Sequence, residues 1–158
     1  MVDRVARTGI GFDVHRFDEG RPLRLGGIQI DAPAGLDGHS DGDVVCHAIA
    51  DALLGAAALG DVGERFPDAD PSFAGIEGTD LLGRAVKIVT DGGWFPRNVD
   101  VTVIAATPAI APHRDAMRAA LAGALGVATT AVSVKATRPE GLGLVGDGIG
   151  CLAVAVLA

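Results

Sequence analysis

Residues 43–59 run Asp43-Val44-Val45-Cys46-His47-Ala48-Ile49-Ala50-Asp51-Ala52-Leu53-Leu54-Gly55-Ala56-Ala57-Ala58-Leu59. Nearly every position in this stretch is apolar or small. Its length and alanine content predict a helix that is buried on most of its faces. His47 lies one turn into this helix, and Asp43 and Asp51 flank it at four-residue spacing. The expected helix is therefore a core element that carries a few polar side chains.

Shorter elements are expected on both sides of this helix. Alternation and short apolar runs predict strands at residues 8–17, 23–25, 28–30, 99–106, 132–136 and 149–157. Further helices are expected at residues 79–91, with Thr79 as N-cap, and at residues 112–125, beginning at a proline. Polar composition predicts irregular segments at residues 31–42 and 60–78. This order predicts the class α/β (an α+β sandwich), with a single mixed β-sheet, helices packed on one face, and one domain over residues 1–158.

Composition restricts the partners. The chain has 158 residues, of which 49% are hydrophobic and 21% charged, as is typical of one soluble globular domain. Its formal charge is −7 and 4% of its residues are aromatic, so we expect no nucleic-acid partner. No stretch is apolar enough to span a bilayer, and we expect no membrane partner. Cys46 and Cys151 lie in apolar stretches as expected buried thiols, which indicates a cytoplasmic location.

Three residues form a candidate metal site. Asp13 and His15 are two apart on an expected strand, so their side chains leave the same face. Together with His47 they offer one carboxylate and two imidazoles, a common set for a first-row divalent metal with one position open to substrate. Asp51 would then hold the other nitrogen of His47. The alternative is a core His47 satisfied by Asp51, with Asp13 and His15 merely ending a strand.

His39 and Ser40 directly precede the start of the long helix at Asp41-Gly42-Asp43. A helix N-terminus offers unpaired N–H groups to an anion, so these residues could border a phosphate site. The alternative is an ordinary serine N-cap beside a solvated histidine. The carboxylates of the following segment, at Asp61, Asp68 and Asp70, either bind hydroxyl groups or make turns.

Five blocks of the chain carry a wider resemblance. They are Gly11-Phe12-Asp13-Val14-His15, His39-Ser40-Asp41-Gly42-Asp43 with His47 and Asp51, Leu53-Leu54-Gly55-Ala56-Ala57-Ala58-Leu59-Gly60-Asp61-Val62-Gly63, Phe66-Pro67-Asp68-Ala69-Asp70, and Val134-Lys135-Ala136-Thr137. In these blocks, and in order from about Gly9 to Leu157, the sequence resembles the 2-C-methyl-D-erythritol 2,4-cyclodiphosphate synthase family.

The resemblance implies an enzyme of the non-mevalonate isoprenoid pathway. Such an enzyme converts 4-diphosphocytidyl-2-C-methyl-D-erythritol 2-phosphate to 2-C-methyl-D-erythritol 2,4-cyclodiphosphate and releases CMP. The implied partner is therefore a small-molecule cytidine diphosphate substrate. The implied assembly is a homotrimer with active sites between neighbouring subunits.

The resemblance also assigns roles to residues. Asp13, His15 and His47 would hold Zn²⁺, and Glu140 would help to place Mg²⁺ or Mn²⁺ on the substrate diphosphate. His39 and Arg138 are the implied catalytic residues. Besides the zinc residues Asp13 and His15, the implied substrate-binding residues are Val14, His39, Ser40, Asp61, Val62, Gly63, Phe66, Pro67, Asp68, Ala69, Asp70, Ala105, Ala106, Thr107, Pro108, Ala109, Ile110, Ala111, Thr137, Arg138, Pro139 and Glu140.

One segment departs from the family pattern. Where the family usually reads Ala-Thr-Thr-Thr-Glu, this chain has Ala136-Thr137-Arg138-Pro139-Glu140, so an arginine replaces a threonine expected to contact phosphate. The departure leaves two alternatives beside the synthase. One is a non-catalytic trimeric module that binds metal and nucleotide, and the other is a metal-dependent phosphohydrolase.

Overall fold

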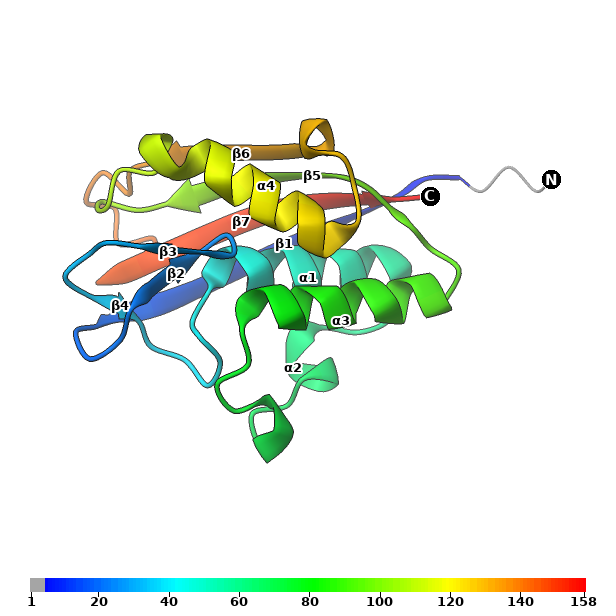
Figure 1. The fold of residues 1–158 in the computed structure, drawn as a ribbon, viewed down its shortest axis with the longest axis horizontal. Helices are drawn as coiled ribbons and strands as arrows, with labels where there is room; N and C mark the ends of the chain where they lie inside the picture. Colours follow the sequence, from blue (N-terminus) through cyan, green and yellow to red (C-terminus); the bar gives the residue numbers. More distant parts are fainter. Residues whose placement is uncertain (1–4) are drawn as a thin grey trace.

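The computed structural model describes residues 5–158, and Figure 1 shows the arrangement of the elements. In chain order these are β1 (Arg7–Asp18), β2 (Leu23–Leu25), β3 (Ile28–Ile30), β4 (Gly35–Leu36), α1 (Val44–Ala57), α2 (Val62–Arg65), η1 (Pro71–Phe73), α3 (Gly78–Asp91), β5 (Pro96–Ile104), η2 (Ala111–His113), α4 (Arg114–Leu125), η3 (Thr129–Ala131), β6 (Val132–Thr137) and β7 (Gly148–Leu157).

The main sheet is mixed, as expected. Its strand order is β4-β1-β7-β5-β6, with β5 and β6 parallel and the other neighbours antiparallel. α1 packs on β1 and β7, α4 packs on β6, and α3 lies against both helices (Figure 1). β2 and β3 form a separate two-stranded sheet, so the expectation of a single sheet is wrong, although one main sheet carries the helices. The class of a mixed sheet with helices on one face is therefore confirmed.

Two glycines of β1 allow α1 to lie directly on the strand. A Cβ atom at Gly9 would lie 2.0 Å from the carbonyl oxygen of Ala52, and one at Gly11 would lie 1.9 Å from that of Ala48. Both distances are far inside van der Waals contact, so only glycine permits this approach. The next residue on the same face of β1 is Asp13, which thereby comes beside α1 near the first turn of the helix.

The structure corrects several expected boundaries. Residue 79 is not the N-cap of α3: the helix begins at Gly78 after Glu77, and Gly78 N–H donates to Asp41 Oδ2 at 2.8 Å. The carboxylate of Asp41, which is distant in sequence, thus satisfies an N–H group at the start of α3. The local sequence pattern had assigned that capping role to Thr79. The proline-led start of the last helix is the separate 3₁₀ turn η2.

Both segments expected to be irregular contain short elements. β4 lies within residues 31–42, and α2 and η1 lie within residues 60–78. Asp61 accepts from Glu64 N–H at the start of α2, and Asp70 accepts from Ser72 N–H at the start of η1. The aspartates that suggested loops act as helix caps instead.

The two cysteines are free and buried, as expected. Burial raises the pKa of both thiols, Cys46 on α1 and Cys151 on β7. Within residues 5–158, the structure contains no helix with the length and apolar character that crossing a membrane requires.

Candidate active site

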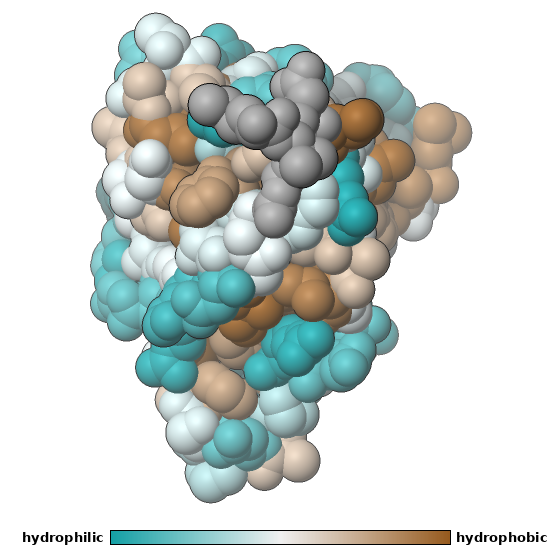
Figure 2. Space-filling model, turned by 90° about the vertical axis from the view of Figure 1, so that its right-hand side faces the viewer, coloured by the Kyte–Doolittle hydropathy of each residue, from teal (hydrophilic) through white to brown (hydrophobic). Residues whose placement is uncertain are grey.

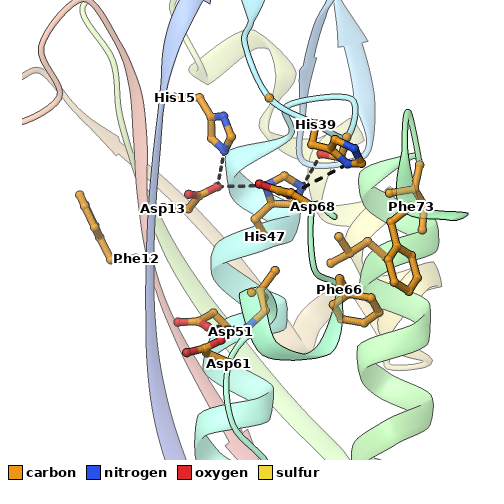
Figure 3. A pocket seen from close by; sticks show the side chains of 16 residues that line it. Phe12, Asp13, His15, His39, His47, Asp51, Asp61, Phe66, Asp68 and Phe73 are labelled. Carbon is orange, nitrogen blue, oxygen red and sulfur yellow. Dashed lines mark hydrogen bonds and ion pairs between the residues drawn. The ribbon is translucent and has the colours of Figure 1, made fainter. Parts of the chain in front are cut away.

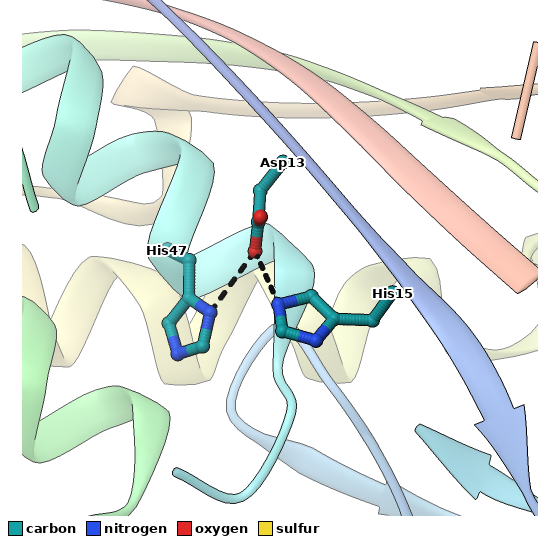
Figure 4. A group of neighbouring side chains, drawn as sticks. All are labelled: Asp13, His15 and His47. Carbon is teal, nitrogen blue, oxygen red and sulfur yellow. Dashed lines mark hydrogen bonds and ion pairs between the residues drawn. The ribbon is translucent and has the colours of Figure 1, made fainter. Parts of the chain in front are cut away.

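Asp13, His15 and His47 converge at the contact between β1 and α1. Asp13 Oδ2 lies 2.9 Å from His15 Nε2 and 3.0 Å from His47 Nδ1 (Figure 4). One ligand atom from each residue lies within 4.8 Å of the other two. This donor set and spacing fit a divalent metal ion held by three protein ligands. The structure thus brings the three predicted ligands together, and the alternative of a core His47 satisfied by Asp51, apart from Asp13 and His15, is wrong.

The ionisation of Asp13 suits such a site. Burial by itself would raise the pKa of the Asp13 carboxyl, but hydrogen bonds and charge from His15 and His47 hold it well below its usual range. The hydrogen bond to Asp13 raises the pKa of His15, against the opposing effect of burial. The carboxylate is therefore ionised at neutral pH, as a metal ligand must be.

The outer nitrogens of the two histidines have partners that sequence reasoning missed. His15 Nδ1 bonds to the Asp37 carbonyl oxygen, and His47 Nε2 lies 2.8 Å from Ser40 Oγ. The expectation that Asp51 would hold His47 is wrong, because Asp51 Oδ1 accepts from Val62 N–H at 3.2 Å. Asp51 instead fixes the loop that follows α1.

The start of α1 is capped by Asp43, so Ser40 is not its N-cap. Asp43 Oδ1 accepts from Val45 N–H and Cys46 N–H, each at 3.1 Å. Because these donors are occupied, the helix N-terminus does not offer them to an anion, which corrects that interpretation. Asp43 is fully buried and also accepts from Gly26 N–H and Gly27 N–H of the β2–β3 turn.

A cavity of about 560 Å³ opens beside the cluster (Figure 3). Of the predicted residues it is lined by Asp13, His15, His39, Ser40, His47, Asp61, Val62, Gly63, Phe66 and Asp68. His39 Nδ1 lies 4.0 Å from Asp68 Oδ1, and Phe66 packs edge-on against Phe73 at 5.4 Å. Phe12, across β1 from the cluster in Figure 3, also borders this cavity.

Some predicted residues do not line this cavity, and some lining residues were not predicted. Val14 is 43% exposed on the opposite face of β1 from Asp13, and Asp70 is the cap of η1. Pro67 and Ala69 belong to the loop after α2 but are not in the lining. The unpredicted lining residues are Phe12, Gly38, Asp51, Phe73, Ile76 and Leu81. The apolar ones give no local signal, because they come from separate elements that only the fold brings together.

A second cavity of about 330 Å³ lies at the end of the β5–β6 pair. Its lining contains the predicted residues Ala105, Ala106, Pro108, Ala109, Ile110, Ala111, Thr137 and Arg138, together with Ala136 and Arg114. Thr107, Pro139 and Glu140 do not line it. No residue lines both cavities, and Glu140 lines neither. Thr107 and Pro108 line a further cavity of about 470 Å³, so the predicted residues of this chain do not share one cavity.

Within residues 5–158, a carboxylate and two imidazoles open to a large cavity on an α+β sandwich. These features define a class of candidate metal-dependent enzymes. The YgbB family profile matches residues 6–158. A 2-C-methyl-D-erythritol 2,4-cyclodiphosphate synthase from Pseudomonas aeruginosa is 53% identical over 153 residues, which cover 96% of this chain and 98% of that protein.

Solved structures of related proteins have the same fold as this chain. A 2C-methyl-D-erythritol-2,4-cyclodiphosphate synthase in a CDP-bound form has a TM-score of 0.89 and 36% identity, covering 96% of this chain and all of that one. The bifunctional IspDF from Campylobacter jejuni has a TM-score of 0.91 and 42% identity; 97% of this chain is covered, but only 42% of that longer chain. This chain belongs to the 2-C-methyl-D-erythritol 2,4-cyclodiphosphate synthase (YgbB) family.

Proposed function

We propose that this chain converts 4-diphosphocytidyl-2-C-methyl-D-erythritol 2-phosphate to 2-C-methyl-D-erythritol 2,4-cyclodiphosphate with release of CMP, as a phosphorus–oxygen lyase of isoprenoid biosynthesis. The observation that carries the proposal is the Asp13, His15 and His47 cluster beside its cavity, in a chain that shares 53% identity with a synthase of that name. The free, buried thiols Cys46 and Cys151 support a reducing cytoplasm as its location.

The chemistry asks the protein for positioning and charge neutralisation rather than for covalent help. The 2-phosphate of the substrate is already an anionic nucleophile, so no side chain has to create it. A Zn²⁺ ion held by Asp13, His15 and His47 would reduce the negative charge on the attacked diphosphate. The chain itself carries a net charge of −7, so its own field opposes an anionic substrate.

The remaining residues would orient the substrate. His39, Ser40 and the loop of Phe66, Pro67, Asp68, Ala69 and Asp70 would surround the methylerythritol phosphate. Asp61 and Gly63 would hold the ribose, and Glu140 would help to place Mg²⁺ or Mn²⁺ on the diphosphate. Holding nucleophile and phosphorus in line would supply much of the rate acceleration.

The separation of the two cavities supports a homotrimer with active sites shared between subunits. The second cavity, which would receive cytosine, shares no residue with the metal-side cavity of the same chain. Ile10, Phe12, Val14 and Leu152 are 43–68% exposed on the outer face of β1 and β7, and apolar atoms also gather at the upper right of Figure 2. Burying this face against a second copy would remove apolar surface from water.

Arg138, which departs from the family pattern, has a role that can be tested. It lines the second cavity, where a guanidinium could make a bidentate, charge-assisted contact with phosphate. Arg138→Ala is expected to reduce kcat/KM by roughly 10- to 100-fold, the scale of one lost contact of this kind. Zinc content and melting temperature should match wild type, as should the kinetics of Arg97→Ala, an exposed arginine on β5. Kinetics of Arg138→Ala within about twofold of wild type would show that the arginine is a bystander.

One assay separates the synthase from its two alternatives. The protein is incubated with the cytidylyl substrate, zinc and magnesium, and the phosphorus NMR spectrum is followed. Cyclic diphosphate with CMP supports the proposal. Unchanged substrate indicates a non-catalytic binding module, and inorganic phosphate indicates a phosphohydrolase.

A further inference from the structure

We propose that Ser40 is a positioning residue that holds the His47 imidazole in the orientation and tautomer that metal binding requires. The inference rests on the proposed function, because it assumes a divalent metal at Asp13, His15 and His47. It goes beyond that function by giving Ser40 a role on the ligand itself, apart from any contact with substrate.

The contacts place Ser40 on the far side of the ring from the metal ligands. His47 Nδ1 faces Asp13 Oδ2 at 3.0 Å, and His47 Nε2 faces Ser40 Oγ at 2.8 Å. The His47 side chain is 11% exposed and Ser40 is 6% exposed, so little water can replace either partner. The ring is therefore held at both nitrogens.

A metal bound through Nδ1 needs the lone pair of that nitrogen, so the neutral ring must carry its proton on Nε2. The Nε2–H group then donates to Ser40 Oγ. Without metal, Nδ1–H donates to the Asp13 carboxylate, and Nε2 accepts from the Ser40 hydroxyl. A hydroxyl can play both parts because it is donor and acceptor, whereas the Asp37 carbonyl on His15 can only accept. Ser40 can thus serve His47 in both states.

The segment that carries Ser40 is itself fixed. Arg21 Nη1 donates to the Gly38 carbonyl at 2.6 Å, and Arg21 Nη2 donates to the Ser40 carbonyl. The His39 carbonyl accepts from Gly75 N–H at 2.9 Å, and Ser40 Oγ also accepts from Gly42 N–H at 3.3 Å. Residues 37–40 therefore form one anchored segment that supplies the outer partner of both histidine ligands, through Asp37 and Ser40. Such outer partners orient a ligand and raise its affinity for metal.

The test measures zinc affinity by competition with a chromophoric chelator, without substrate. Ser40→Ala is expected to weaken zinc binding by about 10- to 100-fold, whereas Ser40→Thr, which keeps the hydroxyl, should stay within about threefold of wild type. Ser72→Ala is the matched control, since Ser72 is exposed on η1 and lines neither cavity. Its zinc affinity should equal that of wild type.

A second readout reports the tautomer. In zinc-loaded protein labelled with ¹⁵N-histidine, the His47 Nε2 proton should give a slowly exchanging NMR signal in wild type and Ser40→Thr, and exchange rapidly with water in Ser40→Ala. Zinc binding by wild type with unchanged affinity in Ser40→Ala would overturn this inference alone. A wild-type chain that binds no zinc would overturn both this inference and the metal site of the proposed function.

Discussion

His47→Ala is expected to remove both zinc and activity while the chain stays folded. His47 provides one of three protein ligands, so its loss leaves Asp13 and His15, too few for a stable site. Losing several kcal/mol of charge stabilisation should lower the rate of CMP release by about 10³-fold or more. The measurements are elemental analysis for zinc and the phosphorus NMR assay for product.

A matched variant shows whether the effect is specific to His47 or follows from the removal of any histidine. His113 lies on η2 and lines neither cavity, so His113→Ala should keep wild-type zinc content and activity. Circular dichroism and size-exclusion chromatography should show that the His47→Ala chain keeps its fold and assembly. Full zinc occupancy in His47→Ala would refute the metal assignment.

Gly11→Ala should strongly destabilise the fold. An added methyl group would lie 1.9 Å from the Ala48 carbonyl oxygen and 2.8 Å from Ala52 N, so backbone rather than a flexible side chain has to move. Overpacking of this kind typically costs about 1–3 kcal/mol, and the backbone clash places this substitution at about 3 kcal/mol or above. Urea denaturation followed by circular dichroism measures the loss.

Gly55→Ala is the matched control for that substitution. Gly55 lies in α1, and a Cβ atom there meets nothing within 4 Å. Replacing it should raise the free energy of unfolding by up to about 1 kcal/mol, because alanine favours the helix.

Because Gly11→Ala pushes α1 away from β1, it should also separate His47 from Asp13 and weaken zinc binding. Equal stability of the Gly11→Ala and Gly55→Ala variants would contradict this account of the packing.

Local patterns predicted the parts of the site but not how they meet. The two-residue spacing of Asp13 and His15 placed both side chains on one face of β1, which the structure confirms. Spacing alone could not join them to His47, because that contact depends on how α1 crosses β1. Glycine at alternate positions 9 and 11 was the available signal, since it marks where a strand admits close approach of another backbone.

The expectations that failed were mostly assignments of local partners. Four-residue spacing suggested Asp51 as the partner of His47, and the capping pattern suggested Thr79 as the N-cap of α3. Instead, Ser40 contacts His47, and Asp41 accepts from Gly78 N–H at the start of α3. Ser40 and Asp41 take these roles because the segment before α1 lies against the starts of both α1 and α3. Capping rules consider only neighbours in sequence, so they cannot detect such partners.

The central claim is that each active site combines the metal cluster of one subunit with the second cavity of its neighbour. Its most direct test mixes two inactive variants, His47→Ala, which lacks the metal cluster, and Ala109→Trp, which fills the second cavity at an exposed position. Co-expressed with different tags and purified as mixed trimers, they should recover about a third of wild-type CMP release, because every mixed head-to-tail ring contains one interface out of three that joins two intact halves. Activity no higher than that of the two parent variants would contradict the claim.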